Sequence, residues 1–196
     1  MQAIDNVLLS LHDAHTTYVK PSCYSIFAVQ PFALSSFYNT SVHQQQVFIN
    51  GIYQYASKWT QDFTKYNGWT IIAIDDEDAL PHIVAYAYKN AWLSKDISVM
   101  FNWALESGFQ QRTLALFDMP AKNARKYTLQ DPKSGNVVQL VVPYLMVVAG
   151  GDITAKNCFA SSPRHTVSSG NVLEEFSMPP EFKTLQGQGT QKAVRA

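Results

Sequence analysis

Two histidines and an aspartate lie close together near the start of this chain, at His12, Asp13 and His15. An imidazole oriented by a carboxylate can act as a general base, because the carboxylate fixes the ring tautomer and stabilises the ring once it is protonated. The segment therefore indicates acid–base chemistry. Two alternatives stay open: a metal site, and histidines that only hydrogen bond to a carbonyl near a helix end.

The metal alternative fits the spacing poorly. Zinc sites on helices place two histidines four positions apart, beside a glutamate, and add a third ligand. His12 and His15 are three positions apart, and the segment has no such glutamate. A second acidic run, 75–78, lacks the glycine and the terminal glutamate of a calcium loop, so we interpret it as a solvated turn at a helix start. We expect no metal and no cofactor.

The composition is typical of one globular domain or slightly more. The 196 residues are 46% hydrophobic, 15% charged and 13% aromatic, and 15 basic side chains balance 15 acidic ones. This balance argues against nucleic acid as a partner. The longest nearly apolar stretch, 137–149, is too short for a membrane-spanning helix, and the first residues do not have the pattern of a signal peptide. We therefore expect no membrane association.

The two cysteines, Cys23 and Cys158, match neither a metal-binding nor a redox spacing. They are either two small buried side chains or, in an oxidising compartment, one long-range disulfide. The sequence assigns neither the compartment nor the oligomeric state.

Helices and strands are mixed along the chain rather than regularly alternating, which favours an α+β fold over a doubly wound parallel sheet. Apolar residues at helical spacing over 4–11 predict that the chain begins within an amphipathic helix. Aromatic and β-branched residues over 18–50 predict short strands, the clearest being Val47–Ile49, which should meet a turn at Asn50-Gly51. Aromatic residues spaced by four over 52–65 predict a helix with these rings on one face.

The middle of the chain predicts a compact strand–turn–helix unit followed by a second helix. The strand covers 69–74, and a helix over 80–92 follows the acidic turn with Asp78 as its N-cap. The second helix should begin at Ser94 or Asp96 and end before a C-cap at Gly108.

The end of the chain divides into a hairpin and a polar tail. Strands over 127–130 and 137–142 are joined by a turn containing proline and glycine. Beyond 150, serine, proline and glycine dominate, which predicts a linker or tail. We therefore divide the chain into an N-terminal helix and extended segment (1–50), a core domain (51–149) and a linker or tail (150–196).

Four blocks of sequence resemble serine peptidases of the chlamydial protease-like activity factor (CPAF) type, within the C-terminal-processing or tail-specific peptidase family. The blocks follow the order of that family over about residues 5–148. They read LLSLHDAHTTYVKPSCYSIF, GWTIIAIDDEDALPHI, SKDISVMFNWAL and YTLQDPKSGNVVQLVVPYL. Three positions depart from its pattern: Glu77 replaces a turn glycine, Met100 an arginine and Tyr144 a tryptophan.

The resemblance implies a PDZ-like domain over 51–149 and a protein or peptide substrate. It also implies that His15 is the general base. Asp13, two residues before it, is a candidate to support the imidazole. The serine nucleophile and the glutamate that orients the base belong to a later catalytic domain in the family, and no segment here matches them. The serines of the tail lack the Gly-rich elbow that exposes a nucleophile; they are Ser161, Ser162, Ser168 and Ser169.

Three hypotheses follow. The first is that the chain is a CPAF-like N-terminal fragment, inactive without the missing catalytic domain, whether as a truncated product or as a lone regulatory piece. The second is a module that adds an extended peptide to the sheet edge near 69–74. The third is a small hydrolase that uses His12, Asp13 and His15 with an unrecognised serine. The resemblance leaves secretion of full-length relatives open.

Overall fold

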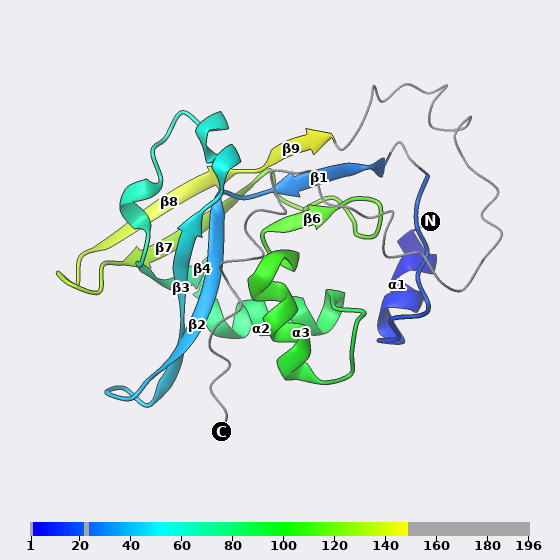
Figure 1. The fold of residues 1–196 in the computed structure, drawn as a ribbon, viewed down its shortest axis with the longest axis horizontal. Coiled ribbons are helices and arrows are strands. Elements are labelled where there is room, and N and C mark those ends of the chain that lie inside the picture. The colour runs from blue at the N-terminus through cyan, green and yellow to red at the C-terminus, as the bar shows by residue number, and fades with distance from the viewer. Residues whose placement is uncertain (1, 22–23, 149–196) are drawn as a thin grey trace.

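The computed structural model describes residues 2–21 and 24–148, which form two antiparallel sheets with helices packed against the larger one (Figure 1). The α+β class predicted from the sequence is confirmed. The larger sheet has the order β2 (Phe32–Asn39), β3 (Gln44–Ile52), β4 (Thr70–Ile74), β7 (Ala124–Gln130) and β8 (Val137–Pro143), with β5 (Glu77–Asp78) paired to β4. The smaller sheet has the order β6 (Gln111–Thr113), β1 (Ile26–Val29) and β9 (Leu145–Val148).

The helices are short. They are α1 (Gln2–Ser10), α2 (Ala79–Asn90), α3 (Ile97–Trp103), the 3-10 helices η2 (Gln54–Lys58) and η3 (Thr64–Tyr66), and the π-helical turn η4 (Ala104–Gly108). None of the described helices is long and apolar enough to cross a membrane. Figure 1 shows α1 at the opposite end of the long axis from the β7–β8 turn.

The core lies between the larger sheet and the helices. Elements α2 and η4 contact strands of this sheet, and α3 packs on α2. The largest fully buried side chains include Tyr127, Phe32, Phe109, Ile49 and Ile83. Alternation along β7 places Tyr127 and Leu129 in this core, which is the period of two expected for a strand with one buried face.

β3 is longer than the sequence predicts. The strand at Val47–Ile49 is confirmed, but the turn predicted at Asn50-Gly51 is wrong. Gly51 pairs with Ala33 and Ile49 pairs with Leu34, so Asn50 is an extra residue in a β-bulge. β3 also crosses the predicted boundary at residue 50, although the division of the chain into three parts stays a prediction.

The aromatic segment over 52–65 is not an α-helix, as its spacing predicted, but two 3-10 helices joined by an irregular stretch. The predicted ring packing is nevertheless present. The ring centroids of Tyr55 and Trp59 are 6.1 Å apart, and those of Trp59 and Phe63 are 6.2 Å apart. Packing between successive rings therefore does not require a continuous helix.

The strand–turn–helix unit is confirmed, with a tighter turn than expected. Asp75 and Asp76 have φ values of 54° and 72°, as a type I′ hairpin turn requires, and β4 pairs with β5 across them. Asp78 holds the N-cap position of α2, but its side chain makes no capping hydrogen bond.

The second helix begins as predicted and ends differently. Asp96 caps α3, since its side chain accepts hydrogen bonds from the backbone of Ser98 and Val99. The predicted C-cap role of Gly108 is wrong by one residue, because this glycine is the last residue of the π-helical turn η4 and the C-cap is Phe109. A Cβ at Gly108 would lie 2.4 Å from the ring of Trp103, so glycine is needed there for space.

The closing hairpin of β7 and β8 is confirmed, with Gly135 at a φ of 73° in its turn. The predicted linker or tail lies outside the described residues.

Candidate active site

The structure separates the two histidines of the predicted site. His12 ends the helical segment with a φ of 48°, and its Nδ1 lies 2.8 Å from the carbonyl oxygen of Ala91. A carbonyl only accepts, so Nδ1 of His12 donates this hydrogen bond. The ring also packs against Tyr88, with centroids 5.5 Å apart. His12 therefore anchors the end of α1 to the end of α2.

Asp13 and His15 are brought together at the surface. The backbone N–H of His15 donates to Asp13 Oδ1 at 2.9 Å, and His15 Nδ1 lies 3.2 Å from the same oxygen. The hydroxyl of Thr16 donates to Asp13 Oδ2 at 3.2 Å. These contacts form an Asx turn, which a short polar side chain closes on its own backbone. The His15 side chain is 95% exposed, and that of Asp13 is 49% exposed.

This geometry leaves His15 able to act as a base. An ionised carboxylate cannot donate, so the neutral imidazole carries its proton on Nδ1 when it bonds to Asp13. The lone pair of Nε2 is then free on an exposed ring. The pKa of Asp13 is lowered from 3.8, first by the backbone N–H of His15 and then by its ring, so Asp13 is ionised at neutral pH.

Two other aspartates, Asp62 and Asp131, form the same turn. Asp62 accepts from the backbone N–H of Thr64 at 2.8 Å, and Asp131 accepts from that of Lys133 at 3.0 Å. Hydrogen bonds lower the pKa of both carboxyls, as they do for Asp13. The turn thus forms from local sequence at three places. Asp13 differs from Asp62 and Asp131 because its carboxylate also contacts an imidazole.

Long-range contacts hold the segment that follows His15. Lys20 is buried, with 7% of its surface exposed, and its Nζ donates to the carbonyl oxygen of Phe117 at 3.1 Å. Its backbone N–H donates to Ala115 at 3.0 Å. The His15 turn is therefore fixed on one side by His12 and on the other by Lys20.

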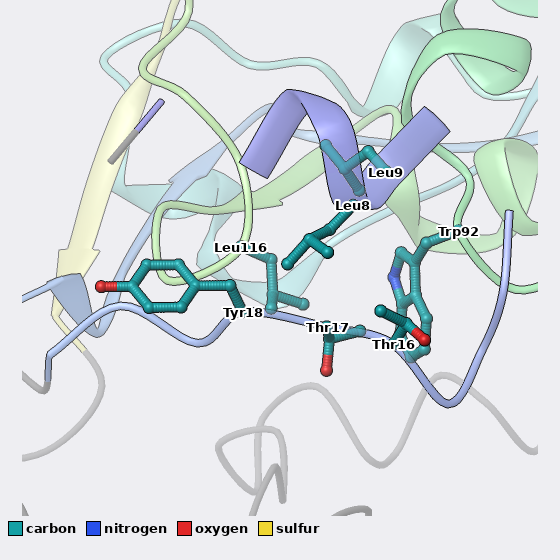
Figure 2. A pocket seen from close by; sticks show the side chains of 7 residues that line it. All are labelled: Leu8, Leu9, Thr16, Thr17, Tyr18, Trp92 and Leu116. Atoms are coloured by element: carbon teal, nitrogen blue, oxygen red, sulfur yellow. The ribbon is translucent and has the colours of Figure 1, made fainter. Parts of the chain in front are cut away.

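A shallow apolar depression adjoins the turn, with room for about one water molecule. Figure 2 shows the side chains of Leu8, Leu116 and Trp92 at this depression, together with Thr16. The other residues that line it are Leu9, Thr17 and Tyr18. The helix predicted from the first residues is confirmed as α1, but most of its predicted apolar face is exposed: Ile4 by 53%, Val7 by 62% and Leu11 by 48%. Of the described side chains of α1, only those of Leu8 and Leu9 line the depression, and the sequence did not show that Trp92 and Leu116 would complete it.

A second histidine–carboxylate pair was missed by the sequence analysis. His82 Nδ1 lies 2.7 Å from Glu77 Oε2, a shorter contact than that of His15 with Asp13. The His82 side chain is only 21% exposed, and its ring meets the edge of Phe109 at 5.8 Å. His82 is therefore held between β5 and the core, and a large external partner has less access to it than to His15.

The acidic run has basic neighbours. The Nζ of Lys126 lies 2.6 Å from Asp76, and the Nζ of Lys122 lies 3.6 Å from Asp75. Within residues 2–21 and 24–148, no group of three or more histidine, cysteine, aspartate or glutamate side chains is placed to hold a metal ion.

A buried polar cluster joins the two sheets and was also missed. The hydroxyl of Tyr127 lies 3.3 Å from Gln30 Oε1 and 3.2 Å from Gln110 Oε1, and all three residues are fully buried. Burial raises the pKa of Tyr127 to about 12, so this hydroxyl stays protonated. The Nε2 of Gln110 has no partner among the described residues. Sequence alone gives no signal for such a cluster, since polar residues are usually exposed.

The strand predicted to accept a peptide lies inside the sheet. β4 pairs with β3 and β5 on one side and with β7 on the other, so it has no continuous free edge. The predicted place of peptide addition, near 69–74, is therefore wrong. The outer strands of the larger sheet are β2 and β8.

The four serines of the predicted tail and both cysteines lie outside the described residues. They are Ser161, Ser162, Ser168, Ser169, Cys23 and Cys158.

Comparisons with known proteins give a fold but no sequence family. No protein-family model matches, and no curated protein matches the sequence. A structure of mature CPAF complexed with lactacystin aligns with a TM-score of 0.52 and 12% identity, over 77% of this chain and 26% of that chain. The fold resembles part of CPAF. A crystal structure of mature CPAF gives the same TM-score with 14% identity, over 74% of this chain and 24% of that one.

The chain thus spans about a quarter of the CPAF chains that it matches. The resemblance predicted from the order of four sequence blocks is confirmed at the level of the fold. An identity this low shows the fold alone, so the role of His15 stays a prediction.

Proposed function

We propose that this chain is the N-terminal and PDZ-like portion of a CPAF-like serine peptidase, in which His15 is the general base and Asp13 supports it. The observation that carries the proposal is the Asp13–His15 pair, an exposed imidazole with Nδ1 facing a carboxylate. This is the arrangement that a serine hydroxyl needs in order to lose its proton to Nε2. The fold similarity to CPAF supports it.

The base alone does not hydrolyse peptides. Serine peptidases lose nearly all their rate enhancement when the nucleophile is removed, even if the base remains. No segment of this chain resembles the Gly-rich serine elbow, so the hydroxyl must come from a catalytic unit outside it. That unit is the partner of the His15 surface, and a protein or peptide is the substrate of the completed site.

The PDZ-like assignment of 51–149 belongs to the same proposal. It is supported by the order of elements, in which β4, a tight turn and α2 are followed by the β7–β8 hairpin. The departures at Glu77, Met100 and Tyr144 do not disrupt this order. Tyr144 stands where the family has a tryptophan. The guanidinium of Arg125 lies over the Tyr144 ring, 5.6 Å from the ring centroid.

Activity measurements on two forms of the protein test the proposal. The purified 196-residue chain should neither cleave casein nor react with a fluorophosphonate probe. The polypeptide encoded by the complete reading frame around it should do both. Labelling of the chain alone would show a nucleophile within it, and failure of the longer polypeptide to react would contradict a peptidase role.

The alternative is a peptide-binding or regulatory module without a catalytic role. Titration of the chain with a library of peptides distinguishes it, since such a module should bind at least one of them in the micromolar range. The third hypothesis loses support from the geometry, because His12 is directed to Ala91 and away from the Asp13–His15 pair.

A further inference from the structure

β8 is an edge strand without the features that usually protect an edge. It is the outermost strand of the larger sheet and, within the described residues, pairs only with β7. Its sequence over 137–142, VVQLVV, has no charge and no proline. Val137 is 52% exposed and Val141 is 66% exposed. An uncharged, β-branched edge of this kind is a template for pairing with another strand.

The hydrogen bonds at both ends of the hairpin show which backbone groups of β8 face outward. Asp131 N donates to the carbonyl oxygen of Asn136 at 2.9 Å, and Tyr144 N donates to that of Asn123 at 2.9 Å. Bonding direction alternates along an antiparallel strand, so the even-numbered residues of β8 bond to β7. The N–H and C=O groups of the odd-numbered residues, Gln139 among them, therefore point away from the sheet.

The outward-facing residues are self-complementary. The outward-facing positions 137, 139 and 141 are Val, Gln and Val, an order of residue types that is the same in both directions along the strand. About a two-fold axis through Gln139, an antiparallel second strand places Val137 opposite Val141 of the second copy and Gln139 opposite itself. Each opposed pair exchanges two backbone hydrogen bonds, and no like charges meet.

We propose that β8 pairs with β8 of a second copy of this chain, so that the two larger sheets become one continuous sheet across a two-fold axis. The pairing ends at Pro143, whose carbonyl oxygen accepts from Trp59 Nε1 at 2.9 Å. The opposite edge strand, β2, does not offer the same surface, because η4 packs against it. This inference does not depend on the proposed function.

The association state of the complete 196-residue chain tests the pairing. Sedimentation velocity over a range of concentrations should show a monomer–dimer equilibrium. Val141→Lys places a charge in the outward-facing series and should raise the dimer dissociation constant at least tenfold. Val99→Lys makes the same change on α3, where Val99 is 46% exposed, and should leave the constant unchanged.

A second variant avoids any question of added charge. Gln139→Pro removes the outward-facing N–H at the two-fold axis. No hydrogen bond to β7 is lost, because the N–H of Gln139 points away from β7, and proline is tolerated at such edge positions. It should weaken the dimer as strongly as Val141→Lys does. Far-UV circular dichroism should show that both variants keep the fold.

Disulfide trapping tests the register. Opposed residues that share backbone hydrogen bonds have Cα atoms about 5.5 Å apart, which lies within the range for a disulfide. In a background with Cys23→Ser and Cys158→Ser, Gln139→Cys should oxidise to a covalent dimer. Val137→Cys is the control. In the proposed register, position 137 of the second copy is four residues further along the strand, roughly 14 Å away at about 3.4 Å per residue, which is too far for a disulfide.

A dimer with this pattern of variants supports the pairing. A chain that stays monomeric at every concentration would overturn it, as would a dimer that resists both Val141→Lys and Gln139→Pro. Open-ended polymers in place of a dimer would also overturn it. If only a truncated 1–148 chain dimerised, residues 149–196 would be the occupant of β8 in place of a second copy.

Discussion

The Asp13–His15 turn and the cluster around Phe109 both place a charged group beside a ring, but they are built in opposite ways. The turn closes on itself through hydrogen bonds within four residues, and its ring is exposed. In the cluster, the guanidinium of Arg125 lies 3.6 Å from the ring centroid of Phe109, which is 1% exposed. Arg125 also donates to the Phe109 carbonyl oxygen at 3.1 Å.

Because of this difference, we expect the Asp13–His15 turn to matter for activity and the Phe109 cluster to matter for the stability of the fold. The hydrogen bonds of the turn come from its own residues, and the long-range contacts that fix the segment are made by His12 and Lys20. Changes at His15 should therefore spare the fold and affect the reaction. The cluster depends on segments that are distant in sequence, so changes there should affect folding. The free energy of unfolding in urea, measured for variants of each region, distinguishes the two.

The largest effect is expected at Phe109. Phe109→Ala removes a buried ring that packs edge-on against Tyr86 with centroids 5.0 Å apart. It also removes the nearer of the two rings under the Arg125 guanidinium, at 3.6 Å against 5.6 Å for Tyr144. We expect a loss of about 3–5 kcal/mol in the free energy of unfolding. Phe37→Ala is the matched control, because Phe37 is 43% exposed and should lose less than about 1 kcal/mol. Equal losses in the two variants would show that the Phe109 cluster stabilises the fold no more than an exposed ring does.

The next effect is expected at the π-helical turn. Gly108→Ala would place a Cβ 2.4 Å from the Trp103 ring, and the forced shift should cost about 1–3 kcal/mol. Gly51→Ala is the control, since its Cβ would lie 3.7 Å from that of Ala33, an ordinary contact. Its stability should change by less than about 1 kcal/mol. If Gly108→Ala left the free energy of unfolding unchanged, the Trp103 ring would have to move away from the new Cβ without cost.

A smaller effect is expected at the start of α3. Asp96→Ala removes hydrogen bonds to the backbone of Ser98 at 2.7 Å and Val99 at 3.4 Å, and should lose about 1 kcal/mol. Asp78→Ala at the start of α2 should change stability by less than about 0.5 kcal/mol, because its side chain makes no capping hydrogen bond. The reverse order would contradict the assignment of the two caps.

The smallest effect on stability is expected at the turn itself. His15→Ala should change the free energy of unfolding by less than about 0.5 kcal/mol, because the ring is exposed. The variant keeps the backbone N–H that is the main cause of the lowered pKa of Asp13, so this pKa should rise only part of the way to 3.8. Carbon-detected NMR titration measures it, and a full return to 3.8 would contradict the Asx turn.

The same shift sets the pH dependence of the turn. A carboxyl whose pKa is lowered in the folded state stabilises that state above its ordinary pKa of 3.8. This contribution is lost as the pH falls through the lower, folded value. The turn should therefore persist throughout the neutral range, in which a general base operates.

Much of the fold could be predicted because it follows local rules. The alternation along β7, the capping by Asp96 and the glycine in the β7–β8 turn each act within a few residues. The errors arose where contacts between distant segments decide the structure. Gly51 was interpreted as part of a turn, whereas pairing with Ala33 of β2 holds it in a strand.

The candidate site shows the same division. The sequence placed Asp13 and His15 in one segment, and an Asx turn brings them together. It could not separate His12 from them, because the partner of His12 is a carbonyl 79 residues away. It also missed the pair of His82 with Glu77, which forms only because a type I′ turn folds β5 back onto β4 next to α2.

We propose that His15, rather than another histidine, is the base of a serine peptidase completed by a further unit. The most direct test compares kcat/KM for a peptide substrate in the complete-reading-frame polypeptide and its His15→Ala, His12→Ala and His82→Ala variants. We predict a loss of about a hundredfold or more for His15→Ala, with the other two variants retaining activity within a few-fold. Full activity in His15→Ala, or a comparable loss in His82→Ala alone, would show that His15 is not the base.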